Sequence, residues 1–146
     1  MSLAGNPSRV TAGSTKNVGF KTGRAPMAVI LVVEDERFIR ENAEWVMKDL
    51  GHDVLLASDL GEALVHLSAP EKIDALFVDI RLNTLPLGGY DIANQAIALR
   101  PELRVLYTSG SPLSADMTDQ FVCEGHFIQK PYSITQLEFS VGKLLH

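Results

Sequence analysis

The sequence has little of several features that mark specialised classes of protein. Its 146 residues include a single cysteine, Cys123, which cannot form an intramolecular disulfide and is typical of a reducing cytoplasm. No apolar run approaches the roughly 18 residues that a membrane span needs. The opening segment MSLAGNPSRV also lacks the apolar stretch of a secretory signal. The sequence therefore predicts a cytoplasmic protein with no place in a membrane.

Acidic residues are missing from the first 26 residues, which makes the distribution of charge uneven. This segment carries four basic residues and is rich in Gly, Ser, Thr, Asn and Pro. Because it cannot bury enough apolar surface to offset the entropy of ordering, we expect residues 1–26 to form a flexible basic arm. The rest of the chain holds nine basic residues against all 18 acidic ones, a balance of −9. A body this acidic repels phosphate, which excludes direct binding of nucleic acid.

Residues 27–146 have the make-up of one ordinary globular domain. The whole chain is 46% hydrophobic and 21% charged, which is typical of globular proteins. Short apolar runs rich in β-branched residues, which are typical of buried strands, alternate with segments of helical spacing. The predicted strands are Met27–Val33, His52–Ala57, Ile73–Val78, Leu103–Tyr107 and His126–Gln129. The predicted helices are Glu36–Leu50, Leu60–Leu67 after an Asp59 cap, Tyr90–Leu99, Pro112–Val122 and Ile134–Leu144 after a Ser133 cap.

Five strands that alternate with five helices predict an α/β fold in which right-handed crossovers build one parallel sheet. Ligands bind beyond the carboxyl ends of the strands in such sheets. Polar residues follow four of the five predicted strands, namely Glu34–Glu36, Asp79, Thr108–Gly110 and Lys130–Pro131. Clustered carboxylates repel one another and need a cation, so we expect a hard divalent ion such as Mg²⁺ at this edge of the sheet.

Four motifs, in this order along the chain, resemble those of the receiver domain of two-component response regulators. They are Val33-Glu34-Asp35-Glu36, Phe77-Val78-Asp79, Thr108-Ser109-Gly110 and Gln129-Lys130-Pro131. The resemblance extends over essentially all of residues 27–146. It implies a flavodoxin-like, doubly wound sheet with its five parallel strands in the order 2-1-3-4-5. It also implies a phosphoacceptor switch, not an enzyme, which catalyses only its own phosphorylation and dephosphorylation.

The resemblance further implies a role for each acidic residue of the predicted pocket. Asp79 matches the phosphoacceptor, whose carboxylate attacks phosphorus and forms an acyl phosphate. Asp35 matches the direct Mg²⁺ ligand, and Glu34 matches the neighbour that commonly acts through a metal-bound water. Asp79 itself and the backbone carbonyl of Arg81 match the positions that complete the metal's protein ligands.

The remaining pocket residues also have counterparts in the family. Lys130 matches the lysine that pairs with the phosphoryl group, and the Lys130–Pro131 bond is expected to be cis. Thr108 matches the hydroxyl that moves onto the phosphoryl oxygens, and Ser109 takes the small position beside it. Phe127 matches the aromatic that rotates inward when this hydroxyl moves, although an ordinary core phenylalanine explains it equally well. The residues expected around the phosphate are Arg81, Ser109 and Pro131.

As a receiver, the chain would accept its phosphoryl group from a sensor histidine kinase or a phosphotransfer protein. It would signal to a downstream protein target through the fourth helix, fifth strand and fifth helix, a surface that could also form a homodimer. Because the sequence ends after the fifth predicted helix, we expect either a stand-alone receiver or a receiver excised from a larger regulator or hybrid kinase.

Two other functions are consistent with the fold class. A phosphohydrolase that forms an aspartyl-phosphate intermediate typically has a second Asp, acting as general acid, two residues after its nucleophile. Here that position is Arg81, which cannot serve as the acid. A nucleotide- or flavin-binding domain would need a first loop rich in Gly or in Ser and Thr. This first loop is Glu34-Asp35-Glu36, which repels phosphate unless a metal intervenes.

Several local patterns give further expectations. The loop between Arg81 and Tyr90 is slightly longer than is usual for the family, and within it Gly88-Gly89 is expected to form a turn. Phe38 and Trp45 lie seven residues apart on one side of the first helix, which favours partial burial. Cys123 is expected to be a small apolar residue near the end of a helix.

Overall fold

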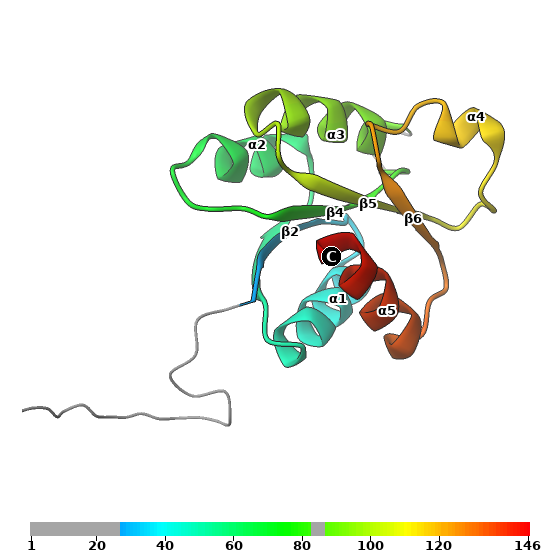
Figure 1. Cartoon of the computed structure of the whole chain (residues 1–146), viewed down its shortest axis with the longest axis horizontal. Helices are drawn as coiled ribbons and strands as arrows, with labels where there is room; N and C mark the ends of the chain where they lie inside the picture. Colours follow the sequence, from blue (N-terminus) through cyan, green and yellow to red (C-terminus); the bar gives the residue numbers. More distant parts are fainter. Residues whose placement is uncertain (1–26, 83–86) are drawn as a thin grey trace, which may run out of the picture.

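The structure is a computed structural model that describes residues 27–82 and 87–146, so the expected basic arm lies outside the described residues. Five parallel strands form one sheet in the order β3-β2-β4-β5-β6. Counted along the chain, this is the order 2-1-3-4-5 that the resemblance implied, and the expected fold is confirmed (Figure 1). The strands are β2 (Val29–Val33), β3 (Asp53–Ala57), β4 (Ala75–Asp79), β5 (Arg104–Ser109) and β6 (His126–Gln129).

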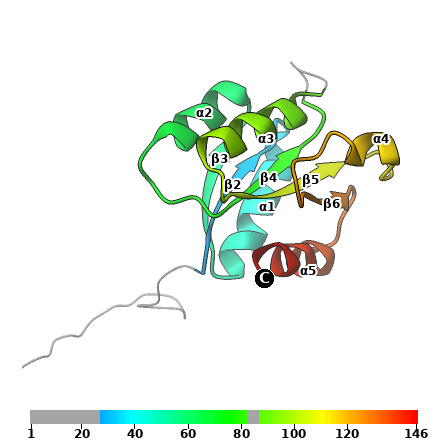
Figure 2. The same ribbon diagram turned by 45° about the horizontal axis from the view of Figure 1, so that its top comes forward.

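Helices cover both faces of the sheet. They are α1 (Arg37–Asp49), α2 (Leu60–Ser68), α3 (Gly88–Leu99), α4 (Ala115–Thr118) and α5 (Ile134–Leu145). Figures 1 and 2 show α1 and α5 together on one face and α2 and α3 on the other. Among the described residues, none of the helices has the length and apolarity needed to cross a membrane.

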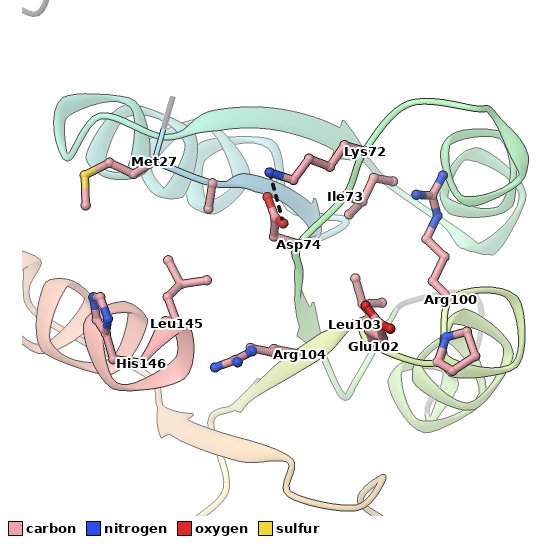
Figure 3. A pocket seen from close by; sticks show the side chains of 12 residues that line it. Met27, Lys72, Ile73, Asp74, Arg100, Glu102, Leu103, Arg104, Leu145 and His146 are labelled. Carbon is pink, nitrogen blue, oxygen red and sulfur yellow. Dashed lines mark ion pairs between the residues drawn. The ribbon is translucent and has the colours of Figure 1, made fainter. Parts of the chain in front are cut away.

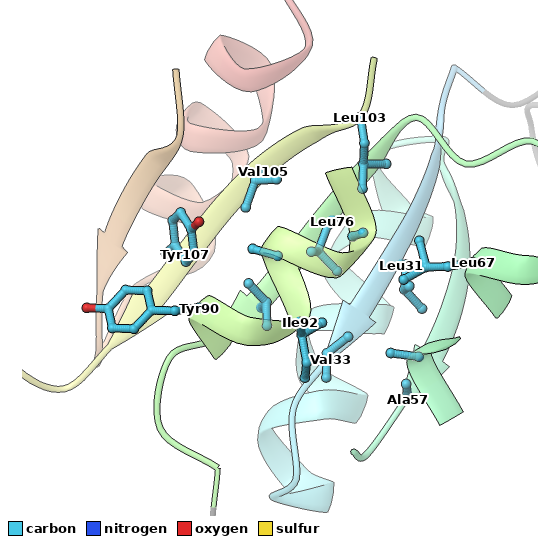
Figure 4. Close-up of a cluster of buried hydrophobic side chains, with 14 of the residues drawn as sticks. Leu31, Val33, Ala57, Leu67, Leu76, Tyr90, Ile92, Leu103, Val105 and Tyr107 are labelled. Atoms are coloured by element: carbon cyan, nitrogen blue, oxygen red, sulfur yellow. The ribbon is translucent and has the colours of Figure 1, made fainter. Parts of the chain in front are cut away.

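The alternation of side chains along the strands produces two cores, one on each face of the sheet. Leu31 and Val33 of β2 point toward α2 and α3, where they join the cluster shown in Figure 4. Ile30 and Val32 point the other way, toward α1 and α5. All five residues of β4 are buried, as expected for the central strand of a sheet covered on both faces.

Two of the predicted helix starts are confirmed in detail. Asp59 Oδ1 accepts a hydrogen bond of 2.8 Å from the backbone N–H of Glu62 at the start of α2. At the start of α5, Ser133 Oγ accepts from Gln136 N at 3.0 Å, and Gln136 Oε1 accepts from Ser133 N at 2.8 Å. This reciprocal capping box begins α5 three residues after Lys130 and thereby fixes the chain that leaves β6.

The fourth helix is much shorter than predicted, since α4 covers Ala115–Thr118 and not Pro112–Val122. The residues after Thr118 leave the helical path because they pack on β5. The Tyr107 hydroxyl accepts a 2.9 Å hydrogen bond from the backbone N–H of Val122, and Glu124 has a φ of 63°. A side chain at Gly125 would lie 2.9 Å from the Tyr107 ring, so the backbone itself contacts this ring. Tertiary contacts to one tyrosine therefore end the helix early.

Three other local expectations were wrong. Phe38 and Trp45 are 80% and 59% exposed, because α1 buries the opposite stripe, which contains Ala43, Val46 and Met47. Cys123 is exposed in the segment after α4. Gly88 and Gly89 are the first residues of α3 and do not form a separate turn.

Candidate functional site

The carboxyl ends of the parallel strands meet at one edge of the sheet, as the sequence predicted. The register places Val33 of β2 beside Val78 of β4, and Asp79 of β4 beside Thr108 of β5. Glu34 follows β2 directly, and Lys130 follows β6 directly. Backbone hydrogen bonds tie these ends together, since Ile80 N donates to Thr108 O at 2.9 Å and Lys130 N donates to Ser109 O at 2.8 Å.

One lysine joins two buried carboxylates at the centre of this edge. Lys130 Nζ lies 2.8 Å from Glu34 Oε1 and 2.8 Å from Asp79 Oδ2. Glu34 is 3% exposed and Asp79 is 5% exposed, so neither charge is well hydrated. Buried charges persist only when they are paired and hydrogen-bonded, and the shared ammonium satisfies that condition for both carboxylates.

The protein backbone holds the two carboxylates in place. Glu34 Oε2 accepts a 3.1 Å hydrogen bond from Glu36 N, and Asp79 Oδ1 accepts a 3.2 Å bond from Arg81 N. Arg81 therefore lies in the turn that directly follows the Asp79 side chain. These bonds orient the two acidic groups before any ligand arrives.

The acidic residues of this edge are arranged to bind a metal ion. Glu34, Asp35 and Asp79 each offer one carboxylate oxygen, and these oxygens lie within 4.8 Å of one another. Hard oxygen donors at this spacing suit Mg²⁺ or Ca²⁺ and do not suit a soft metal. The donor set therefore fits the Mg²⁺ ion expected from the sequence.

The electrostatics of the pocket favour the arrival of a cation. Burial raises the pKa of Glu34 to about 7, and the charge of Asp79 adds to this rise, although hydrogen bonds from Lys130 and the Glu36 N–H oppose it. Burial acts against the charged form of Lys130, but its bonds to Asp79 and Glu34 together outweigh burial and raise its pKa. The Lys130 ammonium therefore remains charged, and it is the one cation paired with both Glu34 and Asp79 among the described ion pairs. A second cation would balance the remaining negative charge.

The two adjacent hydroxyls at the end of β5 have different surroundings. Thr108 is 2% exposed, and its Oγ1 has no hydrogen-bond partner within the described part of the chain. Ser109 Oγ accepts a 3.1 Å hydrogen bond from Ser111 N, so it stabilises the turn after β5. Burying a hydroxyl without a hydrogen-bond partner costs about 1–3 kcal/mol of stability. A ligand that bonded Thr108 would remove this cost, so Thr108 is a better candidate than Ser109 for binding a ligand.

Lys130–Pro131 is a cis peptide bond, as the resemblance implied. Phe127 is half-buried, and its ring stacks on Phe121 with a centroid distance of 6.2 Å. Phe121 stacks in turn on Tyr107 at 4.2 Å. Phe127 therefore lies at the outer end of an aromatic row, a position compatible with either of its two expected roles.

Gly89 is a site residue that sequence reasoning missed. A Cβ atom built on Gly89 would overlap the carbonyl oxygen of Asp79 and would lie 2.5 Å from the Cα of Ile80. The amide of Gly89 also donates a 3.0 Å hydrogen bond to Ile80 O. The first turn of α3 thus packs directly on the backbone of Asp79, and only a glycine allows this approach. The Gly88-Gly89 pair is the signal that the sequence offers, but such a pair equally predicts an ordinary turn.

Replacing Gly89 by alanine should destabilise the protein, because the new methyl group must displace the backbone that carries Asp79. Overpacking of this kind costs about 1–3 kcal/mol, which chemical denaturation can measure. Gly142→Ala is the matched control, since Gly142 lies in α5 and a Cβ there would meet nothing within 4 Å. The control should be as stable as the wild type or more stable. Equal stability of the two variants would contradict the packing argument.

A second hollow, of about 840 Å³, lies far from these residues at the amino ends of the strands (Figure 3). Three of its charged residues already stabilise the fold. Arg100 donates to Leu67 O and Ala69 O, Arg104 donates to Leu144 O, and Asp74 accepts from Val29 N. These three residues secure the ends of helices and strands, so their polar groups are already occupied within the protein.

Comparisons with known proteins agree with this geometry. The model of the response regulator receiver domain family matches residues 30–141. A response regulator receiver protein from Sinorhizobium medicae has a TM-score of 0.72 and 27% identity, and the match covers 81% of this chain and 94% of that chain. NtrX from Brucella abortus has a TM-score of 0.72 and 29% identity, over 81% of this chain but only 26% of that chain.

A response regulator from Burkholderia pseudomallei, solved with a phosphorylated aspartic acid, a calcium ion and citrate, has a TM-score of 0.67 and 23% identity. That match covers 77% of this chain and 65% of that chain, and it shows a shared fold alone. A search of curated proteins found no match. The family model spans most of the described residues and the carboxyl edge holds the family's acidic cluster, so the chain belongs to the response regulator receiver domain family.

Proposed function

We propose that residues 27–146 are a phosphorylation-dependent switch of a two-component system, in which Asp79 accepts a phosphoryl group. The observation that carries this proposal is the buried Asp79 carboxylate, which shares the Lys130 ammonium with Glu34 through two bonds of 2.8 Å. Phosphoryl transfer needs an oxygen nucleophile, cationic groups near the equatorial oxygens and little covalent help from the protein. A carboxylate, an ammonium and a set of metal ligands lie together here.

In the proposed step, a carboxylate oxygen of Asp79 attacks the phosphorus atom of a phosphohistidine on the donor protein. A bond forms between this oxygen and phosphorus while the bond between phosphorus and the histidine nitrogen breaks. The nitrogen keeps the electron pair, so the donor recovers a histidine and Asp79 becomes an acyl phosphate. A divalent cation held by Glu34, Asp35 and Asp79, together with the Arg81 carbonyl, would offset the incoming negative charge.

Two side chains would then form new bonds to the phosphoryl group. Lys130 would turn from the Asp79 carboxylate to the phosphoryl oxygens and keep its charge throughout. Thr108 Oγ1, which is buried without a partner, would donate a hydrogen bond to a phosphoryl oxygen. Ser109, Pro131 and the Arg81 side chain would border the phosphate. Because Lys130 N is bonded to Ser109 O, a shift of Thr108 would reach β5 and β6 together.

The surface of α4, β6 and α5 would carry this change to a downstream protein and could form a homodimer. A sensor histidine kinase or a phosphotransfer protein would supply the phosphoryl group, and the single cysteine keeps the cytoplasm as the expected compartment. Phe127, the outermost ring of the aromatic row, lies on β6 within this surface. The Burkholderia protein is consistent with this chemistry, since a chain of the same fold was solved with a phosphorylated aspartic acid and a calcium ion.

The proposal is tested by incubating the protein with acetyl phosphate and Mg²⁺ and measuring its mass. We expect the mass of one phosphoryl group to be added, and peptide mapping should place it on Asp79. Chelation of Mg²⁺ with EDTA should prevent the addition, because the three carboxylates then lack the cation that offsets their charge. Addition at another residue, or addition that is unaffected by EDTA, would contradict the proposal.

The same incubation separates the switch from a phosphohydrolase. A switch should consume acetyl phosphate slowly and accumulate the acyl phosphate on Asp79. Rapid hydrolysis of several small phosphate esters over many turnovers would favour the enzyme instead. The absence of an acid at position 81 makes the first result the expected one.

A further inference from the structure

Arg40 lies one turn into α1 and reaches back to the acidic turn. Its Nη1 donates a 2.8 Å hydrogen bond to the backbone carbonyl of Glu34, six residues earlier in the chain. This bond is not part of the helix, whose own hydrogen bond from Arg40 N goes to Glu36 O. The half-buried guanidinium therefore serves the turn between β2 and α1 and not the helix that carries it.

This bond holds the backbone carbonyl of the acidic turn, whereas the other bonds of Glu34 hold its amide and its side chain. Glu34 N donates to Ala57 O at 3.1 Å, and the two oxygens of its side chain accept from Glu36 N and Lys130. Only Arg40 holds the Glu34 carbonyl among these contacts. The peptide group is planar, so holding this carbonyl also sets the direction of the following amide and of the Asp35 Cα. Arg40 therefore contributes to the backbone position from which the side chain of Asp35 extends.

The loop that follows β3 lies beside the acidic turn, because Glu34 N donates to Ala57 O at the end of β3. Hydrogen bonds from Ser58 lower the pKa of Glu62 on α2, and the charge of Arg40 acts in the same direction. Glu62 Oε1 accepts from both Ser58 N and Ser58 Oγ, at 2.7 Å and 2.9 Å. Ser58 directly follows the residue that accepts the Glu34 amide.

We propose that Arg40 is a positioning residue for the divalent cation site: its guanidinium holds the Glu34 carbonyl and thereby directs Asp35 toward Glu34 and Asp79. The inference rests on the proposed function to the extent that this site binds Mg²⁺. Arg40 touches neither the cation nor the phosphoryl group in this proposal. Groups that orient metal ligands typically change metal affinity by about 10–100-fold when they are removed.

The charge of Arg40 and its hydrogen bond to the Glu34 carbonyl predict opposite changes in Mg²⁺ affinity when Arg40 is removed. The proposal can therefore be tested by the direction of that change. A guanidinium near a cation site repels Mg²⁺, so its removal would tighten binding if only charge mattered. If Arg40 acts by holding the turn, its removal weakens binding despite the lost repulsion. The sign of the change in affinity therefore separates the two effects.

The experiment measures Mg²⁺ binding by titration calorimetry with the full chain. Arg40→Gln should bind Mg²⁺ roughly tenfold more weakly than the wild type, and Arg40→Lys should lie between them because it keeps a donor. Lys48→Gln is the matched control, since Lys48 also lies on α1, loses the same charge and pairs only with Glu44 at 2.8 Å among the described ion pairs. The control should change affinity by less than about twofold. Unchanged or tighter binding by Arg40→Gln would overturn the proposal.

Amide hydrogen exchange without Mg²⁺ gives a readout that does not depend on metal binding. The Glu36 amide, which donates to Glu34 Oε2, should exchange faster in Arg40→Gln than in Lys48→Gln. Equal exchange in the two folded variants would count against the positioning role. A wild-type protein that binds no Mg²⁺ would instead contradict the proposed function, so the two failures give different results.

Discussion

The Asp79→Asn protein should take up no phosphoryl group from acetyl phosphate under conditions in which the wild type takes up one. The asparagine side chain has nearly the same shape, but its amide is neutral and is a poor nucleophile toward phosphorus. Lys130 would keep its bond to Glu34 and could still donate to the amide oxygen, so we expect the pocket to remain folded. The expected loss is complete, and mass spectrometry of the intact protein measures it.

Asp91→Asn is the control for this variant. Asp91 is an exposed residue of α3 that accepts a hydrogen bond from Gln95, and its replacement removes the same charge from the solvent-exposed surface. It should be phosphorylated like the wild type. Phosphorylation of Asp79→Asn at the wild-type level would mean that another residue accepts the group, and the proposed function would then be wrong.

Replacing Lys130 by methionine should have the largest effect on stability. Methionine fills a similar volume but leaves the buried carboxylates of Glu34 and Asp79 without their shared cation. Removing one partner of a buried ion pair destabilises a protein by roughly 3 kcal/mol or more. Protonation of Glu34, whose pKa is already raised to about 7 by burial, would absorb part of this loss. We therefore expect Lys130→Met to lower the free energy of unfolding by about 3 kcal/mol when EDTA removes divalent cations, as measured by urea denaturation.

Added Mg²⁺ should return part of this stability, because the metal would take over the neutralisation of both carboxylates. Lys72→Met is the matched control, since Lys72 forms a 3.6 Å pair with Asp74 and its side chain is 74% exposed. An exposed pair contributes about 0–1 kcal/mol, and Mg²⁺ should not alter the effect. If the two variants lost equal stability, Lys130 would not be the counter-ion of the pocket.

The parallel sheet and most of its elements could be predicted because their signals are local. The apolar run of β2 and the caps at Asp59 and Ser133 depend on near neighbours in the chain. The length of α4 could not be predicted, because it depends on the contact of Val122 and Gly125 with Tyr107, a residue of another element. The exposure of Phe38 and Trp45 likewise depends on which side of α1 meets the sheet.

Some residues of the candidate site could likewise be predicted from local signals, whereas others depend on tertiary contacts. The positions of Glu34, Asp79, Thr108 and Lys130 could be predicted because each lies at or directly after the carboxyl end of a strand, and parallel strands bring these ends to one edge. Gly89 could not be identified as a site residue, since its importance lies in a contact with the Asp79 backbone across an intervening loop. The bond from Arg40 to the Glu34 carbonyl also could not be predicted, because in the sequence Arg40 is one of several basic residues on α1.

The sequence by itself determined the class of this protein. The order of strands and helices, the acidic turn after β2, Asp79 at the end of β4 and Lys130 after β6 were sufficient for that. The tertiary structure alone decided how the charges are balanced. One ammonium is shared by two buried carboxylates, a threonine hydroxyl is left without a partner, and a guanidinium holds the acidic turn. Residue type and order are properties of the chain, whereas burial and hydrogen bonding depend on neighbours that only folding brings together.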